Sequence, residues 1–242
     1  MPQLGLVGMW RVTAKGVDSD TWLRLGDGAA ILAPDCDMEG GWLATETEFV
    51  ADVLSWGGPC ATDPTESAVW LTSASSYRPL EAGWELLAAD GSLTATLTDD
   101  GWPKGLAGTN PDLLEAPSVT GALLSAYEAP ATLPDGLVAA APLSLVGEWA
   151  PVGPVTEAKP YLRFSDHRRV FTSDGCNDSS SSWLITDGGG FVTTGFVSTA
   201  VGCDGFDVTG ALHTAVTLAT DGDGLLHLLD KSGADIATFS RE

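Results

Sequence analysis

The sequence predicts a mainly β protein with minor helix, built from two tandem antiparallel domains. One observation is a repeat: "LVGMW" at Leu6 returns as "LVGEW" at Leu145, 139 residues later, and "WLRLGD" returns as "YLRFSD" at the same offset. Another is a pattern of short segments that alternate between apolar and polar residues and end in Gly-Asp-Gly, Asp-Gly or Ser-Gly turns. Two matches at one offset indicate a duplication, and short alternating segments indicate antiparallel strands.

The first repeat is expected at residues 1–99. Residues 21–28, "TWLRLGDG", have the alternation and the turn of a strand that leads into a hairpin. One short helix is expected after the second cysteine, where Asp63 is a suitable N-cap and Pro64 occupies the first helical position. In that helix Val69 and Trp70 would face inward.

The segment at residues 100–142 is rich in Pro, Gly and Ala, which is typical of a linker. It also has an apolar periodicity, because Val119, Leu123 and Tyr127 recur every four residues behind Pro117. This spacing predicts a short amphipathic helix at about 117–127. An apolar stripe of this kind favours a helix that packs on one or both domains.

The second repeat is expected at residues 143–242 and keeps the offset to within a few residues. Small length changes in surface turns explain the drift. Residues 207–218 match the helix of the first repeat, although Gly210 weakens this helix, and residues 215–239 hold two or three strands divided by turns. Further corresponding pairs are Cys36 and Cys176, Trp42 and Trp183, and Cys60 and Cys203.

The charge of the chain excludes one class of function. There are 33 acidic and 11 basic residues, which gives a formal net charge of −22. Such a protein repels the phosphates of nucleic acids, so we expect no nucleic-acid partner. We interpret the acidity as a solvated surface.

No apolar run reaches the length that a transmembrane segment needs, so none is expected. The N-terminal residues "MPQLGLVGMW" lack the basic and then apolar pattern of an export signal. Because a signal peptide could have been removed, Met1 is compatible both with a cytosolic start and with a processed, exported chain.

The four cysteines form no C-x-x-C pair, which argues against a zinc site. Each repeat instead has one pair at similar spacing, Cys36 with Cys60 and Cys176 with Cys203, which favours a disulfide in each. Buried free thiols are the alternative. Disulfides would place the protein in an oxidising compartment, so an extracellular or cell-envelope location is expected, with a cytoplasmic location as the alternative.

Few residues could support catalysis. The histidines His167, His213 and His227 are not shared between the repeats, and each is interpreted as a surface or edge residue. The serines at 179–182 lack the glycine frame of a nucleophilic serine and are interpreted as a polar strand edge. The Asp-Gly-Asp-Gly segment at Asp221 is interpreted as a hairpin turn. We therefore expect a protein that is not an enzyme, with no catalytic, cofactor-binding or metal-binding residues.

The second repeat resembles the META/HslJ family of bacterial proteins. The resemblance is carried by "LVGEW", "YLRF", the motif of Gly175, Cys176 and Asn177, "VGC", and the closing hairpin. The first repeat is a divergent member, because Asp35 and Asp37 stand where Gly175 and Asn177 stand. The resemblance implies a small, incompletely closed antiparallel β-barrel with a helix against it. It also implies an envelope-associated or secreted protein of the tandem kind found in actinobacteria.

Six of the nine tryptophans lie in the first repeat. Trp56, Trp70 and Trp84 have no aromatic counterpart in the second repeat, so they are either core residues or the wall of an apolar groove. The three with aromatic counterparts, interpreted as core, are Trp10, Trp22 and Trp42.

These observations together favour a noncatalytic, monomeric binding or stress-related module for an unknown peptide, lipid or cell-wall component. An intracellular protein with reduced cysteines and a hydrolase with an unfamiliar site are the alternatives.

Overall fold

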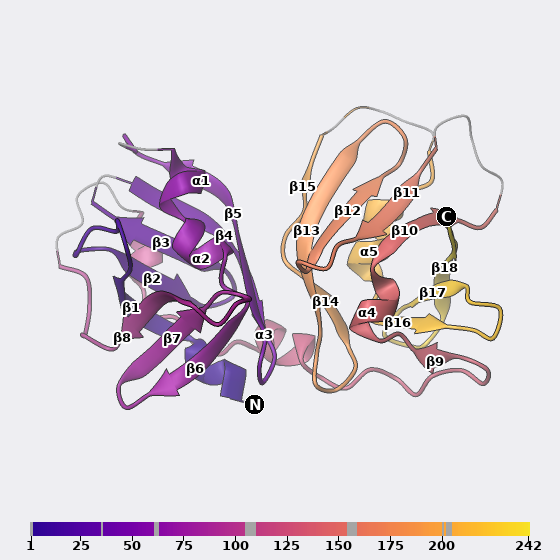
Figure 1. Ribbon diagram of the computed structural model, residues 1–242, viewed down its shortest axis with the longest axis horizontal. Helices are drawn as coiled ribbons and strands as arrows, with labels where there is room; N and C mark the ends of the chain where they lie inside the picture. Colours follow the sequence, from indigo (N-terminus) through magenta and orange to yellow (C-terminus); the bar gives the residue numbers. More distant parts are fainter. Residues whose placement is uncertain are drawn as a thin grey trace. The chain divides into compact units, whose positions relative to one another are not determined.

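The structure is a computed structural model that describes residues 2–34, 36–60, 63–104, 110–153, 159–199, 201 and 205–242. The chain divides into two compact units, Met1–Ser125 and Ala126–Glu242. Each unit is built on an antiparallel sheet accompanied by short helices (Figure 1), so the predicted mainly β class with minor helix is confirmed. The segment predicted as a linker contributes residues to both units.

The first unit has an eight-stranded sheet in the order β5-β4-β3-β2-β1-β8-β7-β6. A 3-10 turn, η1 (Pro2–Leu6), precedes the sheet, and two short helices, α1 (Pro64–Ser67) and α2 (Val69–Thr72), connect β5 to β6. The strands are β1 (Gly8–Thr13), β2 (Trp22–Leu25), β3 (Ala29–Ala33), β4 (Cys36–Ala44), β5 (Phe49–Gly57), β6 (Ser76–Leu80), β7 (Gly83–Leu87) and β8 (Leu93–Thr98).

This sheet curls until its two edge strands, β5 and β6, meet at one end. The N–H of Phe49 donates to the carbonyl of Ser75 at 2.9 Å, and Glu48 forms an isolated bridge with Ser76. The described residues of β5 and β6 share no longer ladder, so the curl is closed at one end and open at the other. Alternate residues of each strand point into the curl, where Leu23, Leu97 and other apolar side chains form the core.

The second unit has a ten-stranded sheet in the order β14-β13-β12-β11-β10-β18-β17-β16-β9, with β15 pairing with β13. A short helix, α4 (Pro142–Leu145), leads into β10, and α5 (Val208–Thr214) leads into β16. The strands are β9 (Val138–Ala139), β10 (Gly147–Pro151), β11 (Tyr161–Phe164), β12 (Arg169–Ser173), β13 (Asp178–Ile185), β14 (Phe191–Thr193), β15 (Val197–Ser198), β16 (Thr217–Thr220), β17 (Leu226–Leu229) and β18 (Asp235–Arg241).

The two sheets have the same strand order once β9 and β15 are set aside. The closing hydrogen bond also recurs, because the N–H of Phe191 donates to the carbonyl of Val216 at 2.8 Å. The indole N–H of Trp10 donates to the carbonyl of Leu6 at 2.8 Å, and that of Trp149 donates to Leu145 at 2.8 Å. Residues that match at an offset of about 140 in the sequence therefore make matching bonds in their own units.

The predicted linker is built into the two units. In the first, η2 (Pro111–Leu114) packs Leu113 on the outer face of β1 to β3, in a cluster with Met9 and Trp22. In the second, β9 extends the sheet by pairing with β16. The segment predicted as a linker thus covers an outer sheet face in one unit and an edge in the other.

The linker helix is shorter than predicted: α3 spans Gly121–Ala126, none of its residues is buried, and Val119 and Tyr127 lie outside it. The hydroxyl of Thr120 accepts from the N–H of Leu123 at 3.1 Å, which explains why the helix begins there and not at Pro117.

The helices after the second cysteine of each repeat are present. Trp70 is buried as predicted, but Val69 is 53% exposed, because the chain turns between α1 and α2 and only one of two adjacent side chains can face the core. In the second unit the side chain of Asp207 accepts from the N–H of Gly210 at 2.7 Å and begins α5. Leu218, predicted at the end of this helix, belongs to β16.

His227 on β17 lies between two carboxylates, that of Asp221 in the turn before β17 and that of Asp235 at the start of β18. The Nδ1 atom of His227 lies 2.7 Å from Asp235 Oδ2, and its Nε2 atom lies 3.3 Å from Asp221 Oδ2. Burial by itself would lower the pKa of His227, but the hydrogen bonds and charges of Asp235 and Asp221 outweigh it and raise that pKa above its usual value.

We predict a pH dependence of stability from this cluster. Because the folded-state pKa of His227 is raised, its contribution is fully present below the ordinary histidine pKa of about 6.5 and is lost as pH rises through the folded value. Urea unfolding between mildly acidic and alkaline pH measures this loss. The His227→Gln variant should show a flatter profile, and an unchanged profile would contradict the prediction.

Candidate functional site

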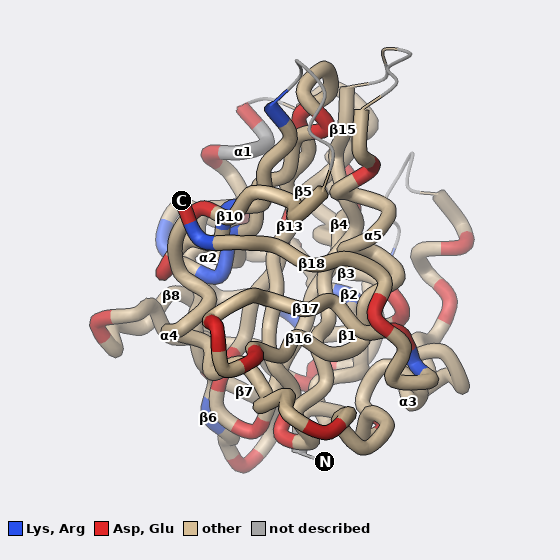
Figure 2. The backbone as a smooth tube through the Cα atoms, turned by 90° about the vertical axis from the view of Figure 1, so that its right-hand side faces the viewer, with Lys and Arg blue, Asp and Glu red and all other residues tan. Residues whose placement is uncertain are grey.

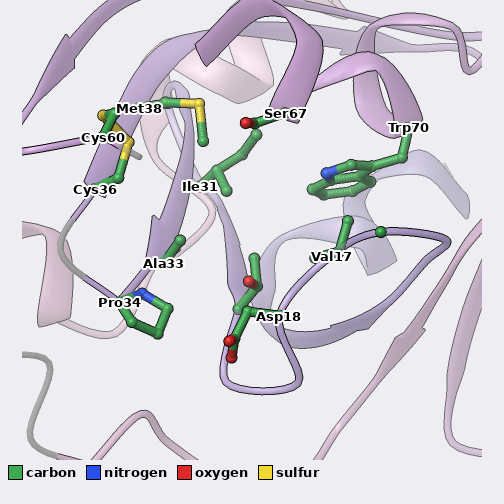
Figure 3. A pocket seen from close by; sticks show the side chains of 12 residues that line it. Val17, Asp18, Ile31, Ala33, Pro34, Cys36, Met38, Cys60, Ser67 and Trp70 are labelled. Carbon is green, nitrogen blue, oxygen red and sulfur yellow. A yellow bond between two sulfur atoms is a disulfide. The ribbon is translucent and has the colours of Figure 1, made fainter. Parts of the chain in front are cut away.

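The first unit contains a cavity of about 170 Å3 beside its disulfide (Figure 3). It lies toward the open end of the curl, because Met38 on β4 is paired with Trp56 near the end of β5, far along both strands from the closing residue Phe49. The lining residues are Gly16, Val17, Asp18, Thr21, Ile31, Ala33, Pro34, Cys36, Met38, Cys60, Ser67 and Trp70.

Three parts of the fold form the walls of this cavity. Ile31 on β3 and Met38 on β4 are paired across the two strands, so their side chains share one face of the sheet and line the cavity together. Trp70 of α2 and Val17 of the β1–β2 loop lie together on one side of the view in Figure 3, with Met38 and the disulfide on the other.

The disulfide joins Cys36, the first residue of β4, to Cys60, which follows β5, with 4.8 Å between their Cα atoms. This is the pairing that the sequence predicts for the first repeat. It holds the chain after β5 against the start of β4 and so keeps one wall of the cavity in place. Closing a loop of 24 residues also restricts the unfolded chain, which stabilises the fold.

The chemistry of the cavity suits an apolar group. Its one charged lining residue is Asp18, which is exposed at the rim and whose Oδ1 accepts from the N–H of Asp20 at 2.8 Å. The lining residues include no histidine, lysine or arginine, so none of them carries a positive charge. It can hold a small apolar moiety by exclusion of water.

The three tryptophans that the sequence leaves as either core residues or the wall of an apolar groove are separated in the structure. Trp70 lines the cavity, and Trp84 on β7 instead packs edge-to-face on Tyr77, with ring centroids 5.5 Å apart. Trp56 is 56% exposed at the far end of β5. Because it pairs with Met38, its side chain lies on the same face of the sheet as the cavity.

The corresponding place in the second unit is filled by polar side chains. Thr172 and Ser179 are paired on β12 and β13 as Ile31 and Met38 are paired on β3 and β4. The hydroxyls of Thr172 and Thr209 lie 2.7 Å apart, and Thr209 also donates to Ser179 at 3.3 Å. Mutual hydrogen bonds satisfy these interior hydroxyls, so the two units differ in what occupies the same end of the curl.

The sequence predicted that the serine run at 179–182 forms a polar strand edge, and this prediction is wrong. The run lies in β13, an interior strand between β12 on one side and β14 and β15 on the other. Ser181 is fully buried and donates to the carbonyl of Thr194 at 2.8 Å, while Ser180 and Ser182 accept from the Arg169 guanidinium. Hydrogen bonds between side chains allow an interior strand to be polar, which a hydropathy pattern does not reveal.

The Gly175-Cys176-Asn177 motif forms the turn between β12 and β13. Gly175 has a φ of 92°, which a residue with a Cβ adopts rarely. The side chain of Asn177 donates to Asp174 Oδ2 at 3.0 Å and to the carbonyl of Val201 at 2.7 Å. Hydrogen bonds from the Asn177 side chain, and then from backbone N–H groups, lower the pKa of Asp174. The motif thus ties the turn to the segment after β15.

The described residues include no free cysteine. Cys203, the predicted partner of Cys176, lies outside the described residues, so the second disulfide stays a prediction. Asp35, which replaces Gly175 in the first repeat, also lies outside them.

The histidines do not gather into a site. His167 is exposed in a turn and lies 3.6 Å from Asp166, and His213 is exposed on α5. The Asp221 carboxylate accepts from the N–H groups of Asp223 and Leu225 within its own turn. In the part of the chain that the structure describes, no group of three or more His, Cys, Asp or Glu side chains is arranged to hold a metal ion.

Acidic residues are distributed along the whole chain, mostly in loops and at strand ends, with few basic residues among them (Figure 2). Among the described residues, no helix has the length and apolar character that crossing a membrane requires. Comparison of the chain with protein-family models, with curated proteins and with solved structures finds no match.

We predict that the double variant Cys36→Ser/Cys60→Ser lowers the free energy of unfolding by about 3 kcal/mol, because it removes a constraint on the unfolded chain. Urea unfolding measures the change. An unfolding free energy equal to that of the native protein in the Cys36 and Cys60 variant would contradict the prediction.

We also predict that Asn177→Ala lowers the free energy of unfolding by about 1–2 kcal/mol, because it removes the side-chain bonds to Asp174 and Val201. The same bonds hold the pKa of Asp174 down, so the variant should raise that pKa. Urea unfolding and carboxyl chemical shifts during an acid titration measure the two effects. An unshifted Asp174 titration would show that Asn177 is not its main partner.

Proposed function

We propose that this protein is a noncatalytic binding module, secreted or associated with the cell envelope, whose first unit holds an apolar group of its ligand in the cavity beside the Cys36–Cys60 disulfide. The observation that carries the proposal is the contrast between the two units at this place. One has a cavity lined mainly by apolar side chains, and the other has the hydrogen-bonded cluster of Thr172, Ser179 and Thr209.

The size of the cavity limits the ligand group. Apolar cavities of about 150 Å3 in other proteins accept a molecule the size of benzene, and this cavity has a volume of about 170 Å3. One aromatic or branched aliphatic side chain of a peptide, or the end of an acyl chain, matches this volume. An unfilled apolar cavity also weakens a fold, so its retention in one unit favours a use for it.

The proposal includes the cellular compartment of the protein and the origin of its two units. A disulfide in the wall of the site favours an oxidising compartment. The matching strand order and the matching bonds of the two units support a tandem duplication of a META/HslJ-like domain. We infer that the ligand is a peptide, a lipid or a cell-wall component, and that the protein acts as a monomer.

The test of the cavity uses toluene as the probe and nuclear magnetic resonance of the tryptophan indole N–H groups as the readout. We expect toluene to shift the signal of Trp70, which lines the cavity. The Ala33→Leu variant should weaken toluene binding at least tenfold, because the added methyl groups occupy the cavity.

The control variant is Ala139→Leu, which adds the same atoms at an exposed position of β9 in the second unit. It should bind toluene as the native protein does. Equal binding by native protein and Ala33→Leu, or no shift of Trp70 at saturating toluene, would refute the proposed site.

A further inference from the structure

A second pocket of the first unit is open and has a volume of about 460 Å3. It shares no lining residue with the cavity beside the disulfide. Its lining residues include Trp10, Trp102 and Asp99, together with Val7 and Gly8 at the start of β1. Two indoles beside one carboxylate form a combination that suits an organic cation.

Hydrogen bonds fix where both indole rings lie. The indole N–H of Trp10 donates to the carbonyl of Leu6 at 2.8 Å, and its ring lies over Gly8, where an added Cβ would come within 2.8 Å of a ring carbon. The indole N–H of Trp102 donates to the carbonyl of Leu114 at 2.8 Å, and this side chain remains 40% exposed. The pocket is therefore formed before any ligand arrives.

The second unit holds a cation in the corresponding place. Trp149, which matches Trp10, makes the same indole bond to a carbonyl four residues earlier. The guanidinium of Arg241 lies over its ring, 4.4 Å from the centroid, and donates to the carbonyl of Val146 at 3.0 Å and to that of Ser144. This stacked guanidinium covers the indole, and Trp149 is only 2% exposed.

In the first unit, Asp99 is at the position that corresponds to Arg241 of the second unit. Arg241 is the residue paired with Trp149 between β10 and β18. The pairing of β1 with β8 ends with Arg11 opposite Thr98, so Asp99, the first residue after β8, follows at the position that corresponds to Arg241. Asp99 and Trp10 both line the pocket. One unit thus supplies its own cation for the indole, and the other presents an anion beside an indole and an open pocket.

We propose that this pocket binds the guanidinium group of an arginine side chain in a partner peptide. The guanidinium stacks on Trp10 as Arg241 stacks on Trp149, and Asp99 is its counter-ion. Val7, which matches Val146, is also a lining residue. A planar, weakly hydrated guanidinium suits this geometry better than an ammonium does, and the net charge of −22 attracts a basic peptide.

This proposal is independent of the disulfide cavity, because the two places share no residue. Its probe is Nα-acetyl-L-arginine amide, added to the full chain, with the indole N–H resonances as the readout. We expect shifts at Trp10 and Trp102. The citrulline analogue, which is neutral and of the same shape, should bind at least tenfold more weakly. Equal binding of the arginine and citrulline probes, or of the arginine and lysine probes, would overturn the proposal.

Substitutions at Asp99 test the mechanism, and because Asp99 is exposed they should leave the fold intact. Asp99→Asn should weaken arginine binding by removing the counter-ion. Asp99→Arg should abolish binding, because it reproduces the arrangement at Trp149 and fills the pocket with the protein's own guanidinium. Urea unfolding confirms that the variant is folded. A folded Asp99→Arg variant that binds the probe as the native protein does would overturn the proposal.

The reverse change provides a second test. Arg241→Asp uncovers Trp149 and should create a new arginine site in the second unit, seen as a shift of the Trp149 indole resonance. If Arg241→Asp is folded and Trp149 does not respond to the probe, the correspondence between Asp99 and Arg241 does not carry recognition, and the proposal fails.

Discussion

The one-ended closure of each curled sheet is the constraint on which the rest of the structure depends. In the first unit the backbone bond from Phe49 to Ser75 and the Glu48–Ser76 bridge join the edge strands at one end. In the second unit the bond from Phe191 to Val216 has the same place. Closing one end lets alternate side chains of all strands meet in one core. The end that stays open must be covered by other groups, and this is where the two units differ.

The two units have the same strand order, but different side chains cover the open end of each curled sheet. The second unit fills it with threonine and serine hydroxyls that satisfy one another, and the first uses apolar side chains, a disulfide and Trp70, which leaves a cavity. A similar divergence occurs at Trp10 and Trp149, where Asp99 and Arg241 give opposite charges to equivalent positions. In both cases the second unit fills the place with its own side chains, and the first unit has a pocket there.

Much of the fold was predictable from the sequence, because strand periodicity, turn residues and an internal offset are local or pairwise features of the chain. They predicted the mainly β class, the Cys36–Cys60 disulfide and the helix that begins at Asp207. The exposed Val69, the shorter linker helix and the interior position of the serine run were not predicted. These depend on where a helix breaks and on hydrogen bonds between side chains, which a hydropathy pattern does not contain.

For the candidate sites, the sequence predicted less than it did for the fold. The sequence by itself determined that the first repeat has three tryptophans without aromatic counterparts in the second, and it identified Trp70 as one of these candidates. Only the tertiary structure decided that Trp70 lines a cavity with the disulfide, that Trp56 and Trp84 lie elsewhere, and that Asp99 and Trp10 line one pocket. The physical reason is that strand register brings together residues almost a whole domain apart in the chain, and register follows from packing of the closed core.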